Sequence, residues 1–286
     1  MDAPPAQEDN KPFIRVAGYL ESMNLNAPRI IEANLKQGFL LLTDLGSTHY
    51  LEKLSAEPEL APRLYSDALR ALVQMQSRGS AYQSLLPSYD DELLRFELSL
   101  FHDWLCEKHL GVEFSENEES EWQGLCELLV NNAIDQPQVF VHRDYHSRNL
   151  MVTERHNPGI LDFQDAVEGP LTYDLVSLLK DCYVHWPLEQ ISAWLQEFYD
   201  GIEPSLQAQI DRDQMQRYFD LMGVQRHLKA SGIFARLNHR DGKPGFMADV
   251  PRTLNYIVAL EPYYEDLGFL VRWINDRCMP GLSDSS

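Results

Sequence analysis

The sequence has few basic residues and no long hydrophobic run. Lys and Arg together number 24 against 44 Asp and Glu, which gives a formal net charge of −20. This excess of negative charge repels phosphate backbones and anionic lipids, so nucleic-acid and membrane-surface partners are not expected. No stretch approaches the roughly 18 uninterrupted apolar residues that a membrane span requires. The opening residues MDAPPAQEDN lack the basic start and the apolar stretch of a signal peptide.

Cysteine is also scarce, and the four that occur are scattered, with no Cys-x-x-Cys pair. They are Cys106, Cys126, Cys182 and Cys278. We interpret them as reduced thiols, which predicts a cytoplasmic protein. What is present is an ordinary globular composition, with 286 residues of which 44% are apolar. A chain of this length and composition can bury a sizeable core in one large domain or two small ones.

The hydrophobic pattern predicts a small αβ segment followed by a larger helical body. Helical spacing begins at Pro12, and apolar residues at 30–31 and 39–42 predict a β-hairpin. A short strand at 139–141 precedes a second predicted hairpin, formed by 150–152 and 160–161. The predicted helices of the body are 50–54, 60–77, 90–108, 118–133, 174–182, 188–199, 211–237 and 251–260.

The chemistry is concentrated in the run His142-Arg143-Asp144-Tyr145-His146-Ser147-Arg148-Asn149 and in Ile160-Leu161-Asp162-Phe163. Because the second predicted hairpin folds back on itself, Asp162 is expected to emerge beside Asn149. Three oxygen-bearing side chains, Asp144, Asn149 and Asp162, then converge, and oxygen ligands are what Mg²⁺ prefers. The spacing is that of the protein-kinase His-Arg-Asp, Asn and Asp-Phe-Gly elements. It predicts phosphoryl transfer, with Asp144 orienting the acceptor hydroxyl and Asn149 and Asp162 holding the metal.

The residues give less support to a zinc site, a hydrolase or a Walker-type nucleotide site. His142 and His146 are four apart and could form a zinc pair, but they lie in a loop with no third ligand nearby in sequence. There is no Gly-x-Ser-x-Gly hydrolase elbow and no Walker A run.

At these motifs the sequence resembles the aminoglycoside-phosphotransferase and choline-kinase branch of the kinase-like superfamily. The residues that carry the resemblance are 142–151, 160–163 and Gly169-Pro170-Leu171-Thr172-Tyr173-Asp174-Leu175. The runs 1–5, 38–46, 222–229 and 231–237 are similar to the bacterial anomeric kinases of N-acetylmuramate and N-acetylglucosamine. The resemblance extends over nearly the whole chain.

The resemblance implies an α+β, protein-kinase-like fold of two lobes. It implies ATP and Mg²⁺ as cofactors and an amino sugar as the small-molecule substrate. Asp144 is then the catalytic base, and Asn149 and Asp162 are the metal ligands. Leu42, Thr43, Asp44 and Leu45 form the interlobe hinge whose backbone meets adenine. Asp174 supports the catalytic loop by hydrogen bonds, while Arg226, His227 and Arg236 are expected to pack and pair on a long helix rather than to contact sugar.

The sequence departs from the family in the small lobe. Gln164 replaces the glycine of Asp-Phe-Gly, no Lys stands near Met1 for the phosphates, and Glu21 is not placed for an ion pair. The glycine-rich loop and its flanking strands are missing. We therefore expect residues 1–42 to form an N-terminally incomplete small lobe, with Met1 an internal methionine or the start of a truncated chain. Residues 43–286 are expected to form the mainly helical large lobe with catalytic loop 142–149. The strands at 30–42 are then expected to expose an edge or a face.

The leading functional hypothesis is an ATP-dependent kinase that phosphorylates the anomeric hydroxyl of N-acetylmuramate or N-acetylglucosamine in cell-wall recycling. An aminoglycoside or other small-molecule kinase is the alternative within enzymes. A choline-type kinase would need an aromatic cage, but Trp104, Trp122 and Trp186 lie in contexts typical of core residues. The incomplete small lobe leaves a third possibility, a non-catalytic nucleotide- or sugar-binding fragment.

Overall fold

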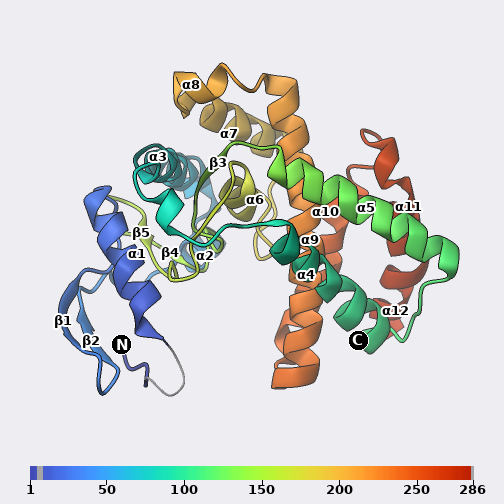
Figure 1. Cartoon of the computed structure of the whole chain (residues 1–286), viewed down its shortest axis with the longest axis horizontal. Helices are drawn as coiled ribbons and strands as arrows, with labels where there is room; N and C mark the ends of the chain where they lie inside the picture. The colour runs from blue at the N-terminus through green and yellow to red at the C-terminus, as the bar shows by residue number, and fades with distance from the viewer. Residues whose placement is uncertain (5–8, 285–286) are drawn as a thin grey trace. The chain divides into compact units, whose positions relative to one another are not determined.

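The fold is mostly helical, with three small antiparallel sheets (Figure 1). A computed structural model describes residues 1–4 and 9–284 of the chain. The chain divides into two compact units, of which the first comprises Met1–Ser88 and Pro137–Met215 and the second Tyr89–Gln136 and Gln216–Ser286. No helix among the described residues is long and apolar enough to cross a membrane.

The six strands found among the described residues all belong to the first unit, as do the two predicted hairpins. Its strands are β1 (Ile30–Asn34), β2 (Phe39–Leu42), β3 (Gln138–Val141), β4 (Leu150–Met151), β5 (Gly159–Ile160) and β6 (Val167–Pro170). Its helices are α1 (Asn10–Ser22), α2 (Tyr50–Ala56), α3 (Ala61–Gly79), α6 (Tyr173–Leu179), α7 (Leu188–Gly201) and α8 (Pro204–Gln207). Both predicted hairpins are confirmed, since β1 pairs with β2 and β4 with β5, each in antiparallel register. Strand β3 also forms, and its partner is β6, which the pattern did not predict.

The second unit is helical. It contains α4 (Asp91–Leu100), a π-helical segment (Phe101–His109), α5 (Glu116–Ile134), α10 (Val250–Val258), α11 (Gly268–Trp273), a second π-helical segment (Ile274–Cys278), α12 (Met279–Asp284) and most of α9 (Arg212–Asp241). The helix predicted at 90–108 forms, but it changes to π-helix after Leu100. At that point Gly232 of α9 approaches so closely that a Cβ would clash with the Leu100 and Phe101 backbone. The helices after residue 267 were not predicted.

The β1–β2 hairpin exposes much of one face, as expected from the sequence. Side chains alternate across a strand, so Leu40 points inward and is 3% exposed, while Phe39 and Leu41 are 50% and 57% exposed. The first residues of the chain cover part of the β2 edge: the Leu40 N–H donates to the Met1 carbonyl at 3.1 Å, and Asp2 bridges Phe39. Figure 1 shows α1 and this hairpin, both blue, next to the N-terminus.

One helix is shorter than predicted, and this matters for the site. The apolar pattern predicted helix from 174 to 182, but α6 ends at Leu179. Lys180 leaves the helical region, with φ −115° and ψ 49°. The carboxylate of Asp181 then accepts the Tyr183 N–H at 3.0 Å, so the chain turns where the pattern would have continued the helix.

Candidate active site

The loop between β3 and β4 is held in place by a buried carboxylate on α6. Asp174 is fully buried and accepts hydrogen bonds from the backbone N–H groups of His142, at 2.6 Å, and Arg143, at 2.9 Å. Charge-assisted bonds of this kind are among the stronger ones in proteins. They hold Arg143 in the left-handed region, at φ +78°. The supporting role expected for Asp174 is confirmed.

Asp144 stands at the centre of this loop, and its side chain is partly exposed. Its side chain is 44% exposed, and the Nε2 atom of His146 lies 4.0 Å from one carboxylate oxygen. Its backbone carbonyl accepts from the His146 N–H at 3.0 Å and from the Asn149 side-chain amide at 3.1 Å. The backbone of Asp144 is therefore fixed by these bonds, while its side chain reaches solvent.

His142 is a neutral structural residue. It is fully buried, and its Nδ1 accepts the Asp144 N–H at 3.2 Å. Burial lowers the pKa of His142 to about 4, because the imidazolium loses its hydration. Since Nδ1 is an acceptor, the proton of the neutral ring sits on Nε2. A ring with its Nδ1 occupied and no solvent access does not suit a zinc pair with His146.

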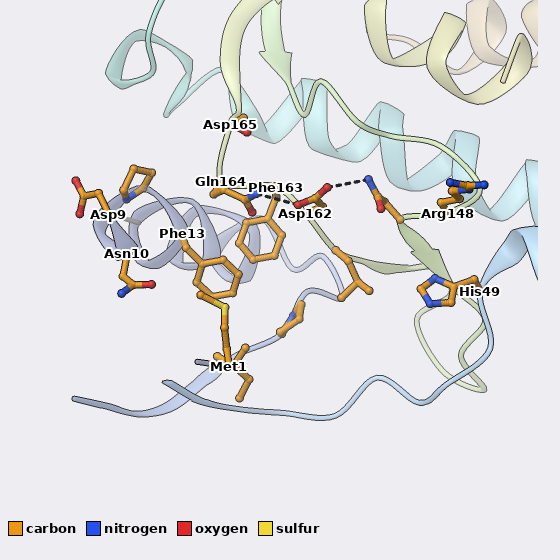
Figure 2. A pocket seen from close by; sticks show the side chains of 15 residues that line it. Met1, Asp9, Asn10, Phe13, His49, Arg148, Asp162, Phe163, Gln164 and Asp165 are labelled. Carbon is orange, nitrogen blue, oxygen red and sulfur yellow. Dashed lines mark hydrogen bonds between the residues drawn. The ribbon is translucent and has the colours of Figure 1, made fainter. Parts of the chain in front are cut away.

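Asn149 and Asp162 are brought together as the hairpin geometry predicts. The Leu161 N–H donates to the Asn149 carbonyl at 2.9 Å, which places Asp162 directly opposite. The Asn149 amide then donates to one Asp162 carboxylate oxygen at 3.2 Å, and the Gln164 amide donates to the other at 2.8 Å (Figure 2). Gln164, in the position of the missing glycine, thus orients the carboxylate. Asp162 has φ +63°, a conformation uncommon outside glycine.

A pocket of about 720 Å³ opens in front of this pair. Its apolar walls include Phe13 of α1 and Phe163, whose rings stack with centroids 4.8 Å apart (Figure 2). Leu42, at the end of β2, lines the same pocket, and so do His49 and Arg148. The pocket therefore joins the β2 end of the first hairpin to Asn149 and Asp162.

The four residues expected to form the hinge do not all face this pocket. Leu42 lines it, whereas Thr43, Asp44 and Leu45 line a separate cavity of about 470 Å³. The Thr43 N–H already donates to the Arg29 carbonyl at 3.0 Å. Along a strand, successive backbone groups point to opposite edges, so the groups of Leu42 point away from β1, like those of Leu40.

The run 222–237, which carried part of the resemblance, lies in α9 within the second unit. His227 is 1% exposed and stacks on Tyr256 with ring centroids 4.9 Å apart. In the same unit, Lys229 pairs with the buried carboxylate of Glu97 at 2.8 Å, and Gln225 donates to Tyr89 at 3.0 Å. His227 therefore packs as expected, and Lys229 and Gln225 of the same helix form buried polar contacts.

Comparison with known proteins gives the family. The model of the phosphotransferase enzyme family matches residues 1–218. This chain belongs to that family. It is similar to the N-acetylmuramate/N-acetylglucosamine kinase of Pseudomonas aeruginosa, with 48% identity over 281 residues that cover 95% of this chain and 80% of that protein. The protein of the same name from Neisseria meningitidis is 38% identical over 284 residues, covering 97% and 84%.

The fold is confirmed by a solved structure. An ethanolamine kinase from Plasmodium vivax superposes with a TM-score of 0.62, covering 86% of this chain and 72% of that chain at 13% identity. The predicted protein-kinase-like α+β fold is therefore correct. As a member of the family the chain is an enzyme, a phosphotransferase whose phosphoryl donor is ATP.

Sequence reasoning missed one part of the site. Asp181 is 1% exposed, and its carboxylate accepts from both the backbone N–H and the hydroxyl of Ser147 in the catalytic loop. The available signal was weak. Asp181 follows the apolar residues Leu178 and Leu179 in a stretch predicted to be helical, and nothing in the pattern named its partner.

Proposed function

We propose that this phosphotransferase transfers the γ-phosphoryl group of ATP to the anomeric hydroxyl of N-acetylmuramate or N-acetylglucosamine, and that it serves the reuse of cell-wall sugars. The single observation that carries the substrate class is the 48% identity to the Pseudomonas aeruginosa kinase of that name, which extends over 95% of this chain. The catalytic elements of the site support the reaction type.

The loop geometry supports the role that we propose for Asp144. Asp144 accepts or orients the proton of the acceptor hydroxyl, because its carboxylate is exposed on a loop whose backbone is fixed. Positioning of this kind supplies much of the rate in phosphoryl transfer, since the protein does little covalent chemistry.

The residues present fit a magnesium ion. Asp162 and Asn149 offer hard oxygen donors at the wall of the pocket, where their hydrogen bonds orient them. The pocket is also acidic. Its lining includes three carboxylates, those of Asp9, Asp162 and Asp165, and the guanidinium of Arg148. A polyphosphate would be repelled there without a divalent cation. When bound, the metal would supply positive charge that neutralises the phosphates and the charge that develops during transfer.

Adenine is proposed to meet the backbone at the end of β2. Leu42 lines the pocket, and its backbone groups point to the edge that β1 does not use. Thr43, Asp44 and Leu45 complete the proposed hinge, and Leu42 is the residue we expect to contact the base. The division into a small lobe at 1–42 and a large lobe at 43–286 is likewise part of the proposal.

The setting of the enzyme is proposed to be the cytoplasm. The four cysteines are free thiols buried in the structure, which suits a reducing compartment. A small-molecule sugar is the proposed partner, and the acidic charge argues against nucleic acid and anionic membranes.

The test is ATP consumption by one preparation with N-acetylmuramate, N-acetylglucosamine, kanamycin or choline, with phosphorus NMR to locate the new ester. We expect turnover with the two amino sugars and a phosphate on the anomeric carbon. Turnover with kanamycin alone would transfer the proposal to an antibiotic kinase. Nucleotide binding with no turnover on any acceptor would indicate a non-catalytic chain.

A choline-type acceptor is not favoured by the aromatic residues. Trp122 is 3% exposed and stacks on Phe101, and the Trp186 indole donates to the Tyr65 hydroxyl at 2.7 Å. Each is engaged in packing, and neither contributes to an open cage for a quaternary ammonium group.

A further inference from the structure

Asp181 holds the second half of the catalytic loop from a segment distant in sequence. One carboxylate oxygen of Asp181 accepts from the Ser147 N–H at 3.0 Å and from the Ser147 hydroxyl at 2.5 Å. The other oxygen accepts from the Tyr183 N–H at 3.0 Å. Both Asp181 and Ser147 are 1% exposed, so these bonds form out of water, where they are strongest.

Ser147 lies between the two residues that the reaction must place. It follows Asp144 by three residues and precedes Asn149 by two. Its carbonyl accepts the Leu51 N–H from α2 at 3.0 Å, so the residue is tied on both sides of its backbone. A shift of Ser147 would therefore change the distance between the proposed base and the proposed metal ligand.

A second buried carboxylate, that of Asp174, holds the start of the same loop. Asp174 binds the N–H groups of His142 and Arg143, and Asp181 binds Ser147, so two buried carboxylates hold the two ends. Burying a carboxylate is costly unless hydrogen bonds compensate for the lost water, and here each carboxylate accepts from backbone N–H groups that an apolar residue would leave without an acceptor. What hydrogen-bonded carboxylates add is a fixed position, which phosphoryl transfer needs.

Tyr183, two residues after Asp181, contacts both neighbours of Ser147. The guanidinium of Arg148 lies 3.7 Å from the centroid of the Tyr183 ring. The His146 ring meets the same Tyr183 ring edge-on, with centroids 5.6 Å apart. Because Asp181 fixes the Tyr183 backbone, one short segment contacts three consecutive residues of the catalytic loop.

We propose that Asp181 is a positioning residue which, acting through Ser147, sets the separation of Asp144 and Asn149 during phosphoryl transfer. The inference rests on the proposed function for its kinetic consequence. Its structural part, the anchoring of Ser147 by Asp181, does not depend on the substrate.

The experiment compares Asp181→Asn, Ser147→Ala and the double variant with the wild type. Asp181→Asn replaces one acceptor oxygen by an amide, and we expect kcat to fall about 10- to 100-fold with the KM for ATP within about twofold. Ser147→Ala, which keeps the backbone bond, should lower kcat about three- to tenfold. The double variant should lie within about twofold of Asp181→Asn, because the hydroxyl acts through the carboxylate.

Ser177→Ala is the matched control. Ser177 is fully buried in α6, and its hydroxyl donates to the Tyr173 carbonyl of the same helix at 3.0 Å. It should lower the melting temperature without lowering kcat. If Asp181→Asn behaves in the same way, or if the effects of Asp181→Asn and Ser147→Ala multiply, the positioning role is wrong.

Hydrogen exchange separates this inference from the proposed function. We expect the amides of the peptide 142–151 to exchange at least about tenfold faster in Asp181→Asn than in the wild type, and to be unchanged in Ser177→Ala. A wild type that turns over no sugar would refute the proposed function while exchange still tests the anchor. Unchanged exchange in Asp181→Asn would overturn the anchor whatever the substrate.

Discussion

Two regions of the first unit differ in how their positions are fixed. In the catalytic loop 142–149, the backbone N–H groups of His142, Arg143 and Ser147 all donate to buried carboxylates. In the hairpin 30–42, the backbone is fixed by an antiparallel ladder with a register shift between Ile30 and Glu32, and Leu41 is 57% exposed. The catalytic loop is thus held by buried carboxylates, whereas the hairpin depends on its own pairing, on backbone bonds to residues 1–3 and on one inward face.

The largest effect is expected from a substitution that changes the catalytic loop but keeps the hydrogen bonds to Asp174 and Asp181. Asp144→Asn keeps the shape and the backbone contacts but removes the charge that orients the acceptor hydroxyl. We expect kcat to fall by about 10³-fold or more with nucleotide affinity nearly intact. Steady-state kinetics and ATP titration measure both quantities. Comparable turnover in the two proteins would remove Asp144 from its proposed role.

The metal pair is expected to show the next largest effect. Asp162→Ala removes a full charge and should lower turnover about 10²-fold at ordinary Mg²⁺ concentrations, while Asn149→Ala removes only a neutral donor and should cost less. Magnesium titration distinguishes the metal role from general damage, because the activation midpoint should move upward. An unshifted midpoint in Asp162→Ala contradicts the assignment. Gln164→Ala, which removes one orienting bond, should fall between the wild type and Asp162→Ala.

The hairpin provides the converse test. Leu40 is 3% exposed and its neighbour Leu41 is 57% exposed, so the same substitution can be made on both faces of one strand. Leu40→Ser should lower the free energy of unfolding by about 2–4 kcal/mol, through lost burial and a buried hydroxyl. Leu41→Ser should change it by no more than about 0.5 kcal/mol. Urea unfolding measures both, and equal losses would show that the face of Leu41 is covered in solution.

The distance in sequence between contacting residues explains which features of the structure the sequence could predict. The meeting of Asn149 and Asp162 was predictable because a short hairpin returns the chain beside Asn149. The contact of Asp181 with Ser147 was not, because 34 residues separate them and no local pattern selects one partner. The hinge at 42–45 stays a prediction, and the bond from Thr43 to Arg29 depends on a strand register that the sequence did not specify. The π-helical change after Leu100 occurs where Gly232, which is distant in sequence, approaches closely.

The smallest expected effect is a dependence of stability on pH that originates in the catalytic loop. Burial lowers the pKa of His142 to about 4, against an ordinary value near 6.5. Between these two values the unfolded chain binds a proton at this residue that the folded chain does not. Acid therefore favours unfolding in this window, and the contribution of His142 vanishes above it.

His142→Asn removes the titrating group while its amide oxygen can still accept the Asp144 N–H, the bond that His142 Nδ1 accepts at 3.2 Å. We expect the free energy of unfolding of the wild type to fall more steeply between about pH 6.5 and about pH 4, by up to roughly 1.4 kcal/mol per pH unit relative to this variant. Urea unfolding at several pH values, without magnesium, measures the difference in slope, and His156→Asn in an exposed turn controls for loss of a surface imidazole. Because carboxylates contribute equally to all three proteins, only the difference reports on His142. Parallel slopes for the wild type and His142→Asn would mean that the loop admits water to this ring, and the contrast between an anchored, dry loop and an exposed hairpin would then be weaker than the structure indicates.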